Sequence, residues 1–497
     1  MAQTTHGAHK RLISCCDGTW MDSLGKQGTC HDGTHQIIMY DPGVGSSDSY
    51  NIREVSNFIC ANCIDGDDII LIGFSRGAFT ARSVADMIAT VGLLTPLGLG
   101  HFYAVFEDFE SVTDVNRDQT LFLDPQVLLY DSEKGKAKRE SEKERKLQYE
   151  EWLTKNGYTR HKYQDGTTEI KIEAIGVWDT VGTLGILPAP VIGLRGSSNQ
   201  QITHLLSVRL LLTSCTWEFP STQISDHVED AFHALALDEP RYAFRPALWE
   251  RLDNTKTNLE QVWLPGSHST AHGSWLSAKK SFPWAKPEIC AAKISSVKRS
   301  VKRDAAECNG KNYHPAGSDE DLWKLARPWG LGLMRDPGGR LQTIGGTTVR
   351  HPGIFKRTDP DTNQDSDEAL LDTNERIYNS VRVRLACQGL ALDDVEIWDC
   401  KPLTRAADGS ALWKLERGSG LTASELRKLY PVGDRDGQWR CVLVDKRRGA
   451  VSLEEVLPEE PVTGYWERYF LALTAGNPGV WRWAEENPPL DAAGSKA

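Results

Sequence analysis

The sequence predicts an α/β domain built on a mainly parallel sheet with helices on both faces. Two observations lead to this prediction. Along the first 275 residues, short apolar runs alternate with segments in which apolar residues recur at helical spacing. Parallel strands need a crossover connection, usually a helix, so this alternation favours a parallel sheet. Several runs are also apolar at consecutive positions, as expected of strands that are buried on both faces.

Five short apolar runs are predicted to be strands, because each is bounded by turn residues. They cover residues 11–16, 35–41, 69–74, 170–178 and 261–266. Residues 226–237 show helical spacing and are predicted to form a helix, with Asp226 capping it and Asp238 at its end. Two further strand-like pieces lie at 380–385 and 438–444.

Composition and charge narrow the class of protein. The chain has 497 residues, of which 40% are hydrophobic and 25% charged, as in soluble globular proteins. Its net charge of −11 disfavours nucleic-acid binding, which normally needs a basic surface. The 11 cysteines are scattered and no apolar leader is visible, so a reduced, cytoplasmic protein is expected. The most apolar later stretch, 205–215, is too short to span a membrane and contains Arg209.

Ser75 is the most informative residue of the chain. It stands in Gly73-Phe74-Ser75-Arg76-Gly77, after an apolar run and before a segment of helical spacing. A Gly-x-Ser-x-Gly turn between a strand and a helix is typical of a nucleophile elbow, which exposes the serine hydroxyl above the sheet edge. The alternative is an ordinary turn in which the serine caps the helix.

Two more predicted strands end in residues that a nucleophilic serine requires. Asp179 follows the fourth strand and His268 follows the fifth, so the order Ser, Asp, His matches that of α/β-hydrolases. The imidazole takes the serine proton and the carboxylate orients the imidazole. Asp226 and Asp238 compete for the role of the acid, and His272 competes for that of the base.

The end of the first strand is predicted to lie beside this cluster. The backbone N–H groups of Gly18, Thr19 and Arg76 are the candidate oxyanion hole. Asp17 is expected at the same sheet edge and, with Asp238, is a candidate supporting residue.

No complete metal-ligand pattern is visible, so no metal or cofactor is expected. Cys60 and Cys63 lack a second pair of ligands, and the remaining metal hypothesis uses Asp17, His268 and His272.

Six motifs in order resemble one family. They are residues 16–20 (CDGTW), 40–45 (YDPGVG), 73–82 (GFSRGAFTAR), 177–182 (VWDTVG), 234–239 (ALALDE) and 262–268 (VWLPGSH). The set is similar to the α/β-hydrolase domain family known as domain of unknown function 2235, which includes catalytic domains of type VI secretion phospholipase effectors, and here to its fungal branch. The resemblance implies a serine hydrolase of carboxylic esters, phospholipids above all, with Ser75, Asp179 and His268 as its triad.

The resemblance also shapes the expected domain organisation. Residues 10–275 are predicted to form the α/β-hydrolase-like catalytic domain, with a charged insertion at 131–148 and an atypical one at 197–222. Residues 280–497 are expected to be an accessory or cap region, partly irregular.

A non-enzymatic alternative stays open. The sequence after His268 departs from the family pattern, and the gaps between the N-terminal motifs are short. These departures favour a second hypothesis, an inactive binding or scaffold protein with the same fold. On the first hypothesis the partner is a small or lipid ester, reached through transient contact with a membrane surface and without a transmembrane segment.

Overall fold

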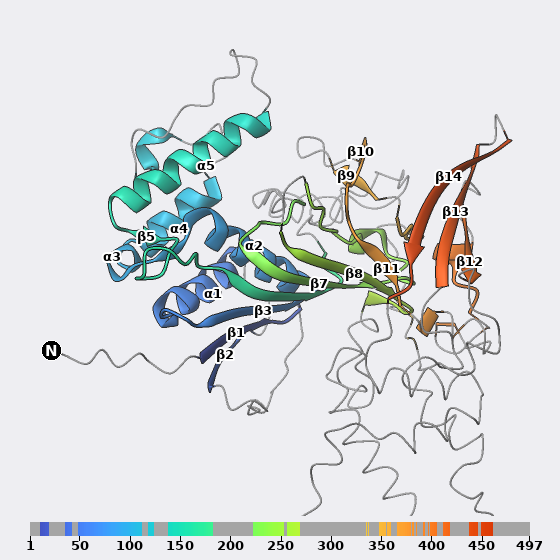
Figure 1. Cartoon of the computed structure of the whole chain (residues 1–497), viewed down its shortest axis with the longest axis horizontal. Coiled ribbons are helices and arrows are strands. Elements are labelled where there is room, and N and C mark those ends of the chain that lie inside the picture. The colour runs from blue at the N-terminus through green and yellow to red at the C-terminus, as the bar shows by residue number, and fades with distance from the viewer. Residues whose placement is uncertain are drawn as a thin grey trace, which may run out of the picture.

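The computed structural model describes residues 10–18, 35–41, 48–111, 118–123, 138–181, 222–252 and 256–268, and shorter stretches between 334 and 460. Within these residues, seven strands form one parallel sheet in the order β11-β8-β7-β6-β3-β1-β2 (Figure 1). The sheet and its helices confirm the predicted α/β class. The strands of this sheet are β1 (Lys10–Cys16), β2 (His35–Asp41), β3 (Asp68–Phe74), β6 (Ile172–Trp178), β7 (Val228–Ala236), β8 (Asn258–Leu264) and β11 (Glu375–Ile377).

Strand β3, which leads to Ser75, lies inside the sheet between β1 and β6. In β3 alternate residues Ile69 and Leu71 are fully buried, and the residues between them are half-buried. The predicted helix at 226–237 is wrong, because this segment is the strand β7 between β6 and β8. Both faces of its second half are covered, so its apolar residues lack the alternation that distinguishes a strand.

Helices α1 (Asp48–Asn62) and α2 (Arg76–Val91) pack against the part of the sheet that includes β1. The two helices contact each other, and α2 lies against β1, β3 and β6. Twelve residues of α2 are buried, which fixes the helix that begins immediately after Ser75. The other described helices are α3 (Pro96–Leu99), α4 (Phe102–Ser111), α5 (Lys138–Lys155) and α11 (Lys401–Thr404).

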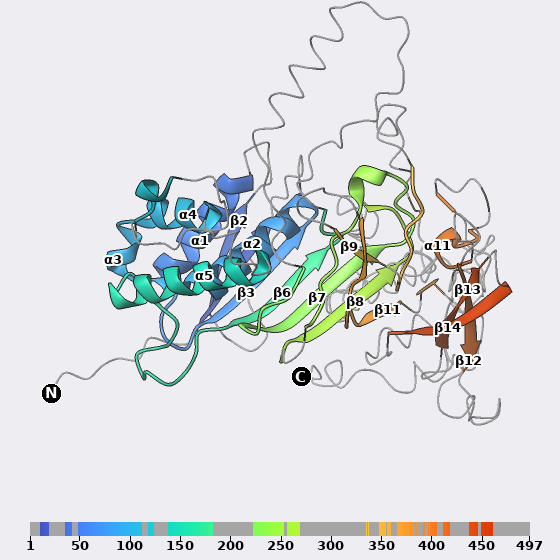
Figure 2. The same ribbon diagram turned by 90° about the horizontal axis from the view of Figure 1, so that it is seen from above.

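Helix α5 begins in the charged run predicted as an insertion. Its C-terminal half buries Tyr149 and Leu153, and the Tyr149 hydroxyl donates to Asp108 Oδ2 at 2.7 Å. Nearby, β4 (Leu93–Leu94) pairs with β5 (Thr159–Arg160) in an antiparallel ribbon. This group of elements lies at the end of the molecule away from β11 (Figures 1 and 2).

The described C-terminal residues extend the main sheet. Strand β11 pairs in parallel with β8, and β12 (Ala411–Arg417), β13 (Gly437–Asp445) and β14 (Gly449–Pro458) form an antiparallel sheet beside it (Figure 2). The short strands β9 (Lys356–Thr358) and β10 (Asp365–Ala369) pair with each other.

Of the two strand predictions in this region, one is correct. Strand β13 confirms the prediction at 438–444. The prediction at 380–385 is wrong, because Ser380, Val381 and Arg384 are helical, and all three are buried. Burial has here overridden the strand preference of Val381. Among the described residues, no helix combines the length and apolarity needed to cross a membrane.

Candidate active site

The turn that carries Ser75 has a strained backbone, and the serine itself is buried. Ser75 has φ 58° and ψ −117°, a backbone conformation that costs roughly 1–3 kcal/mol for a residue other than glycine. Its hydroxyl makes no capping hydrogen bond to α2. Ser75 therefore does not act as a side-chain cap of this helix, which was the alternative interpretation of the motif. The Ser75 N–H donates instead to the Trp178 carbonyl at 3.0 Å, which ties the turn to the end of β6.

Close backbone contacts explain the glycines around this turn. A Cβ placed on Gly77 would lie 2.2 Å from the Cys16 carbonyl oxygen, and one on Gly18 would lie 3.2 Å from Ser75 Cβ. The end of β1 is therefore pressed against the nucleophile turn, at a distance that only glycine permits.

Replacing Gly77 with alanine is expected to lower the free energy of unfolding by about 1–3 kcal/mol and to impair hydrolysis, because the new methyl group overlaps backbone atoms that cannot rotate away. The matched control is Gly176→Ala in β6, where a Cβ would meet no atom within 4 Å. Thermal melts and ester hydrolysis of both variants measure the effect. Equal melting temperatures and equal rates for the two variants would contradict this account of the turn.

The parallel strands bring the predicted acid and base to the same edge. Asp179 follows β6, and its N–H donates to the Ala234 carbonyl of β7 at 2.7 Å. In the same way Leu237 N–H donates to the Leu264 carbonyl of β8 at 2.9 Å. These bonds continue the ladders past the strand ends, so the residues that follow β3, β6, β7 and β8 converge.

His268 links Ser75 to Asp179. Its Nε2 lies 2.8 Å from Ser75 Oγ, and its Nδ1 lies 2.5 Å from Asp179 Oδ2. An ionised carboxylate only accepts, so Nδ1 carries the proton and Nε2 offers its lone pair to the serine hydroxyl. Phe74 stacks on the imidazole at 4.8 Å, and Phe244 meets it edge-on at 4.9 Å between ring centroids. The base is therefore held in one tautomer and one orientation.

Asp179 is completely buried and yet charged. Burial alone raises the pKa of this carboxyl, but the charge of Arg350 and the hydrogen bond of His268 outweigh burial and hold the pKa well below its ordinary value. Ala236 N–H adds a hydrogen bond to Oδ1 at 3.0 Å. The carboxylate thus stays ionised throughout the pH range in which an imidazole titrates.

Two acidic residues after β7 hold the backbone of the histidine loop. Asp238 accepts from Gly266 N–H at 2.7 Å and from Trp398 Nε1 at 2.8 Å, and burial raises its pKa to about 6. Glu239 accepts from His268 N–H at 3.0 Å and is paired with Arg241. Asp238, a candidate supporting residue, and Glu239, which was not among the candidates, therefore both bind the backbone that leads to His268.

The other candidate residues fall into three groups. Asp226 is exposed at the start of β7, at the opposite edge of the sheet from Asp179, and caps no helix. Asp17 lies at the end of β1, where its carboxylate accepts from Tyr40 and from Gly18 N–H, each at 2.8 Å. Thr19 and His272 lie outside the described residues.

Two of the candidate oxyanion donors, Gly18 and Arg76, lie within the described residues. Gly18 lies beside Ser75, but its N–H is directed at Asp17 Oδ1. Arg76 is the first residue of α2, so its N–H belongs to the positive end of the helix dipole. Within the described ranges, no three His, Cys, Asp or Glu side chains gather closely enough to hold a metal ion.

Arg350 contacts the predicted triad from a distant part of the chain. Its guanidinium donates to both oxygens of Asp179, with Nη2 2.9 Å from Oδ2. No motif surrounds it, and it lies far along the chain from its partner, so only a structure could have found it. The sequence shows Arg350 only as one arginine in the region predicted to be accessory, and gives no indication of its contact with Asp179.

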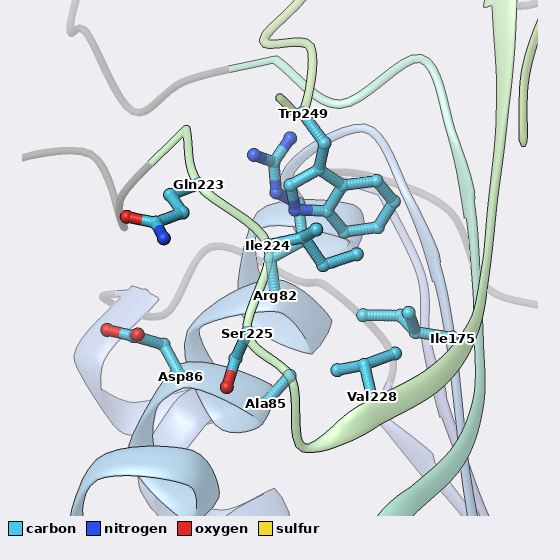
Figure 3. Close-up of a pocket in the computed structure, with 9 residues that line it drawn as sticks. All are labelled: Arg82, Ala85, Asp86, Ile175, Gln223, Ile224, Ser225, Val228 and Trp249. Atoms are coloured by element: carbon cyan, nitrogen blue, oxygen red, sulfur yellow. The ribbon is translucent and has the colours of Figure 1, made fainter. Parts of the chain in front are cut away.

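A pocket elsewhere in the fold contains none of the predicted triad residues. It lies between α2, β6 and the start of β7, and Arg82 reaches into it beneath Trp249, with the guanidinium carbon 4.4 Å from the ring centroid (Figure 3). Burial lowers the pKa of Arg82 to about 9. Because its lining includes none of Ser75, Asp179 and His268, this pocket is distinct from the candidate site at the sheet edge.

A parallel sheet that carries Ser75 in a tight strand-to-helix turn at its carboxyl edge defines an α/β-hydrolase-like domain. Residues 10–295 match the family described as "T6SS, phospholipase effector Tle1-like, catalytic domain". This match covers more than half of the chain, so the protein belongs to that family, as its six motifs predict.

One curated relative is a yeast protein. The chain is similar to the uncharacterized protein YEL023C of Saccharomyces cerevisiae, with 27% identity over 282 residues. The match covers 48% of this chain and 32% of the yeast protein, so it spans about a third of that relative's length. No solved structure matches the chain.

Proposed function

We propose that this protein is a serine hydrolase of lipid carboxylic esters, with Ser75 as nucleophile, His268 as general base and Asp179 as the acid that orients the base. The observation that carries the proposal is the hydrogen-bonded chain from Ser75 Oγ through the imidazole to a buried, ionised carboxylate. Membership of a family of phospholipase catalytic domains supports lipid esters as the substrate class.

The geometry supports the usual two-step reaction of such sites. His268 Nε2 takes the Ser75 proton as Oγ attacks the ester carbonyl carbon, and Asp179 stabilises the imidazolium. The tetrahedral intermediate collapses when the imidazolium returns the proton to the departing alcohol, which leaves an acyl group on Ser75. Water, deprotonated by the same imidazole, then attacks the acyl carbonyl and releases the carboxylic acid.

Stabilisation of the oxyanion falls to backbone donors around Ser75. We assign it to the N–H group of Arg76, which follows Ser75 in the sequence, and to those of Gly18 and Thr19, the candidates from the segment after β1. Gly18 would have to exchange its bond to the Asp17 carboxylate for one to the oxyanion. A single donor of this kind typically contributes about 10²–10³-fold to the rate.

The purified full chain is expected to release fatty acid from phosphatidylcholine vesicles and to cleave a soluble short-chain ester, with or without a chelator. Activity should fall at acid pH because the base must be neutral to accept the Ser75 proton. Asp179 does not cause this fall, because its pKa is held well below its ordinary value.

The other outcomes of this assay separate the alternatives. Complete loss in chelator, reversed by a divalent cation, would favour the metal hypothesis built on Asp17, His268 and His272. Absence of turnover on every ester would favour the inactive binding or scaffold protein. Cleavage of the soluble ester without any release from vesicles would retain the hydrolase and reject lipid as its substrate.

A further inference from the structure

Arg350 makes a forked contact with the acid of the proposed triad. The side chain is buried, and its two terminal nitrogens each donate to one oxygen of Asp179. The same nitrogens also donate to the carbonyls of Ala236 and Phe244, each at 2.6 Å. A planar guanidinium can serve these four acceptors together, whereas the compact ammonium group of lysine cannot.

These contacts fix the rotation of the Asp179 carboxylate. Oδ1 accepts from Ala236 N–H and from Arg350, and Oδ2 accepts from His268 Nδ1 and from Arg350. Each oxygen therefore has two donors, and the carboxyl group cannot turn without breaking bonds in a completely buried site. Removing the guanidinium would also leave a buried carboxylate without its nearest positive charge, which raises the pKa of the acid.

The segment that carries Arg350 also contacts the loop that supports the base. Thr348 N–H donates to the Pro240 carbonyl at 2.8 Å, and Thr347 forms an antiparallel bridge with Arg241. That loop supplies Glu239, which binds the His268 N–H, and Phe244, which packs on the imidazole. Residues 347–350 thus touch the acid directly and the base through one intervening loop.

We propose that Arg350 is a positioning residue of the hydrolase, and that residues 347–350 make the C-terminal region a required part of the catalytic unit. The proposal rests on the function proposed above. Arg350 keeps Asp179 charged and aimed at His268 Nδ1, so that Nε2 keeps its lone pair directed at Ser75. Arg350 lies beyond the part of the chain that matches the family, which ends at residue 295.

The test compares Arg350→Met and Arg350→Lys with a matched control, Arg357→Met, in the full chain. Arg357 also pairs through two nitrogens with a buried carboxylate, that of Glu250, but it touches no residue of the triad. Arg350→Met is expected to lower kcat by about 10²-fold with little change in KM. Misalignment of the hydrogen-bonded chain from Asp179 through His268 to Ser75 typically lowers the rate by about that factor. Arg350→Lys should lose less activity, since lysine keeps the positive charge but cannot bind both oxygens of Asp179 as the guanidinium does.

The pH profile separates positioning from simple support of the fold. Arg350→Met removes a positive charge beside the hydrogen-bonded pair of Asp179 and His268, so the pair takes up a proton more easily and the acid limb of kcat moves to higher pH. Arg357→Met is expected to leave the acid limb in place even if it lowers stability. If Arg350→Met keeps the wild-type acid limb and loses activity only in proportion to unfolded protein, the proposal is overturned.

A second readout needs no turnover. The proton between His268 Nδ1 and Asp179 should give a resonance downfield of the amides in the proton NMR spectrum of the wild type and of Arg357→Met. We expect this resonance to shift or disappear in Arg350→Met, whether or not the wild type hydrolyses esters. An unchanged resonance overturns the positioning role, whereas a wild type without activity but with a shifted variant resonance rejects only the proposed function.

Discussion

Replacing Ser75 with alanine is expected to abolish ester hydrolysis and to leave the fold intact. Removal of the nucleophile in triad enzymes typically lowers kcat by roughly 10⁶-fold. The hydroxyl makes no bond to the backbone of α2, and alanine keeps the Cβ that the positive φ already tolerates, so little stability should be lost. Fatty-acid release and a thermal melt measure the two effects.

The matched control is Ser83→Ala, a buried serine two turns further along α2. It also removes one hydroxyl group, within the helix that follows Ser75, and its turnover should stay near that of the wild type. A Ser75→Ala protein that keeps a tenth of wild-type turnover would exclude Ser75 as the nucleophile. An equal loss of turnover in both variants would mean that the effect arises from a disturbed helix α2 and not from removal of the nucleophile.

Asp179→Asn is expected to lower kcat by about 10⁴-fold, the effect of changing the orienting acid in a triad. The amide nitrogen must face either the His268 Nδ1–H or the Arg350 guanidinium, and both are donors. The imidazole then changes tautomer, or the arginine loses its partner. Because Arg350 would remain buried without a countercharge, the free energy of unfolding should also fall, by roughly 3–5 kcal/mol.

The control for this variant tests the competing acid at the same time. Asp226→Asn, at the far edge of the sheet, is expected to retain both activity and stability. Turnover should be measured at a temperature where melts show each variant to be folded. A folded Asp179→Asn protein with wild-type kcat would exclude Asp179 as the acid.

The fold and the chemical core of the site could be predicted because both depend on local sequence. Once the alternation of strands and helices predicts a parallel sheet, an apolar run followed by Ser75, Asp179 or His268 places that residue at the carboxyl edge. The same reasoning failed for β7 (Val228–Ala236), because a strand covered on both faces has no alternation to separate it from a helix.

Two supporting residues, Glu239 and Arg350, could not be predicted, because they act across long separations in the sequence. Glu239 adjoins the predicted Asp238, but its role depends on the approach of the His268 backbone from β8. Arg350 depends on a segment of the C-terminal region crossing the β7–β8 loop. Neither residue belongs to a motif whose spacing implies the contact, and the physical reason for each is the need to satisfy a buried charge.

The most direct test of the account is to treat the full chain with a fluorophosphonate probe and to map the modified residue by mass spectrometry. The probe reacts with a serine only when a neighbouring base activates it. We predict modification of Ser75 in the wild type, none in Ser75→Ala, and strongly reduced modification in His268→Ala. Ester hydrolysis by a wild-type protein in which Ser75 remains unmodified would contradict the assignment of Ser75 as an activated nucleophile.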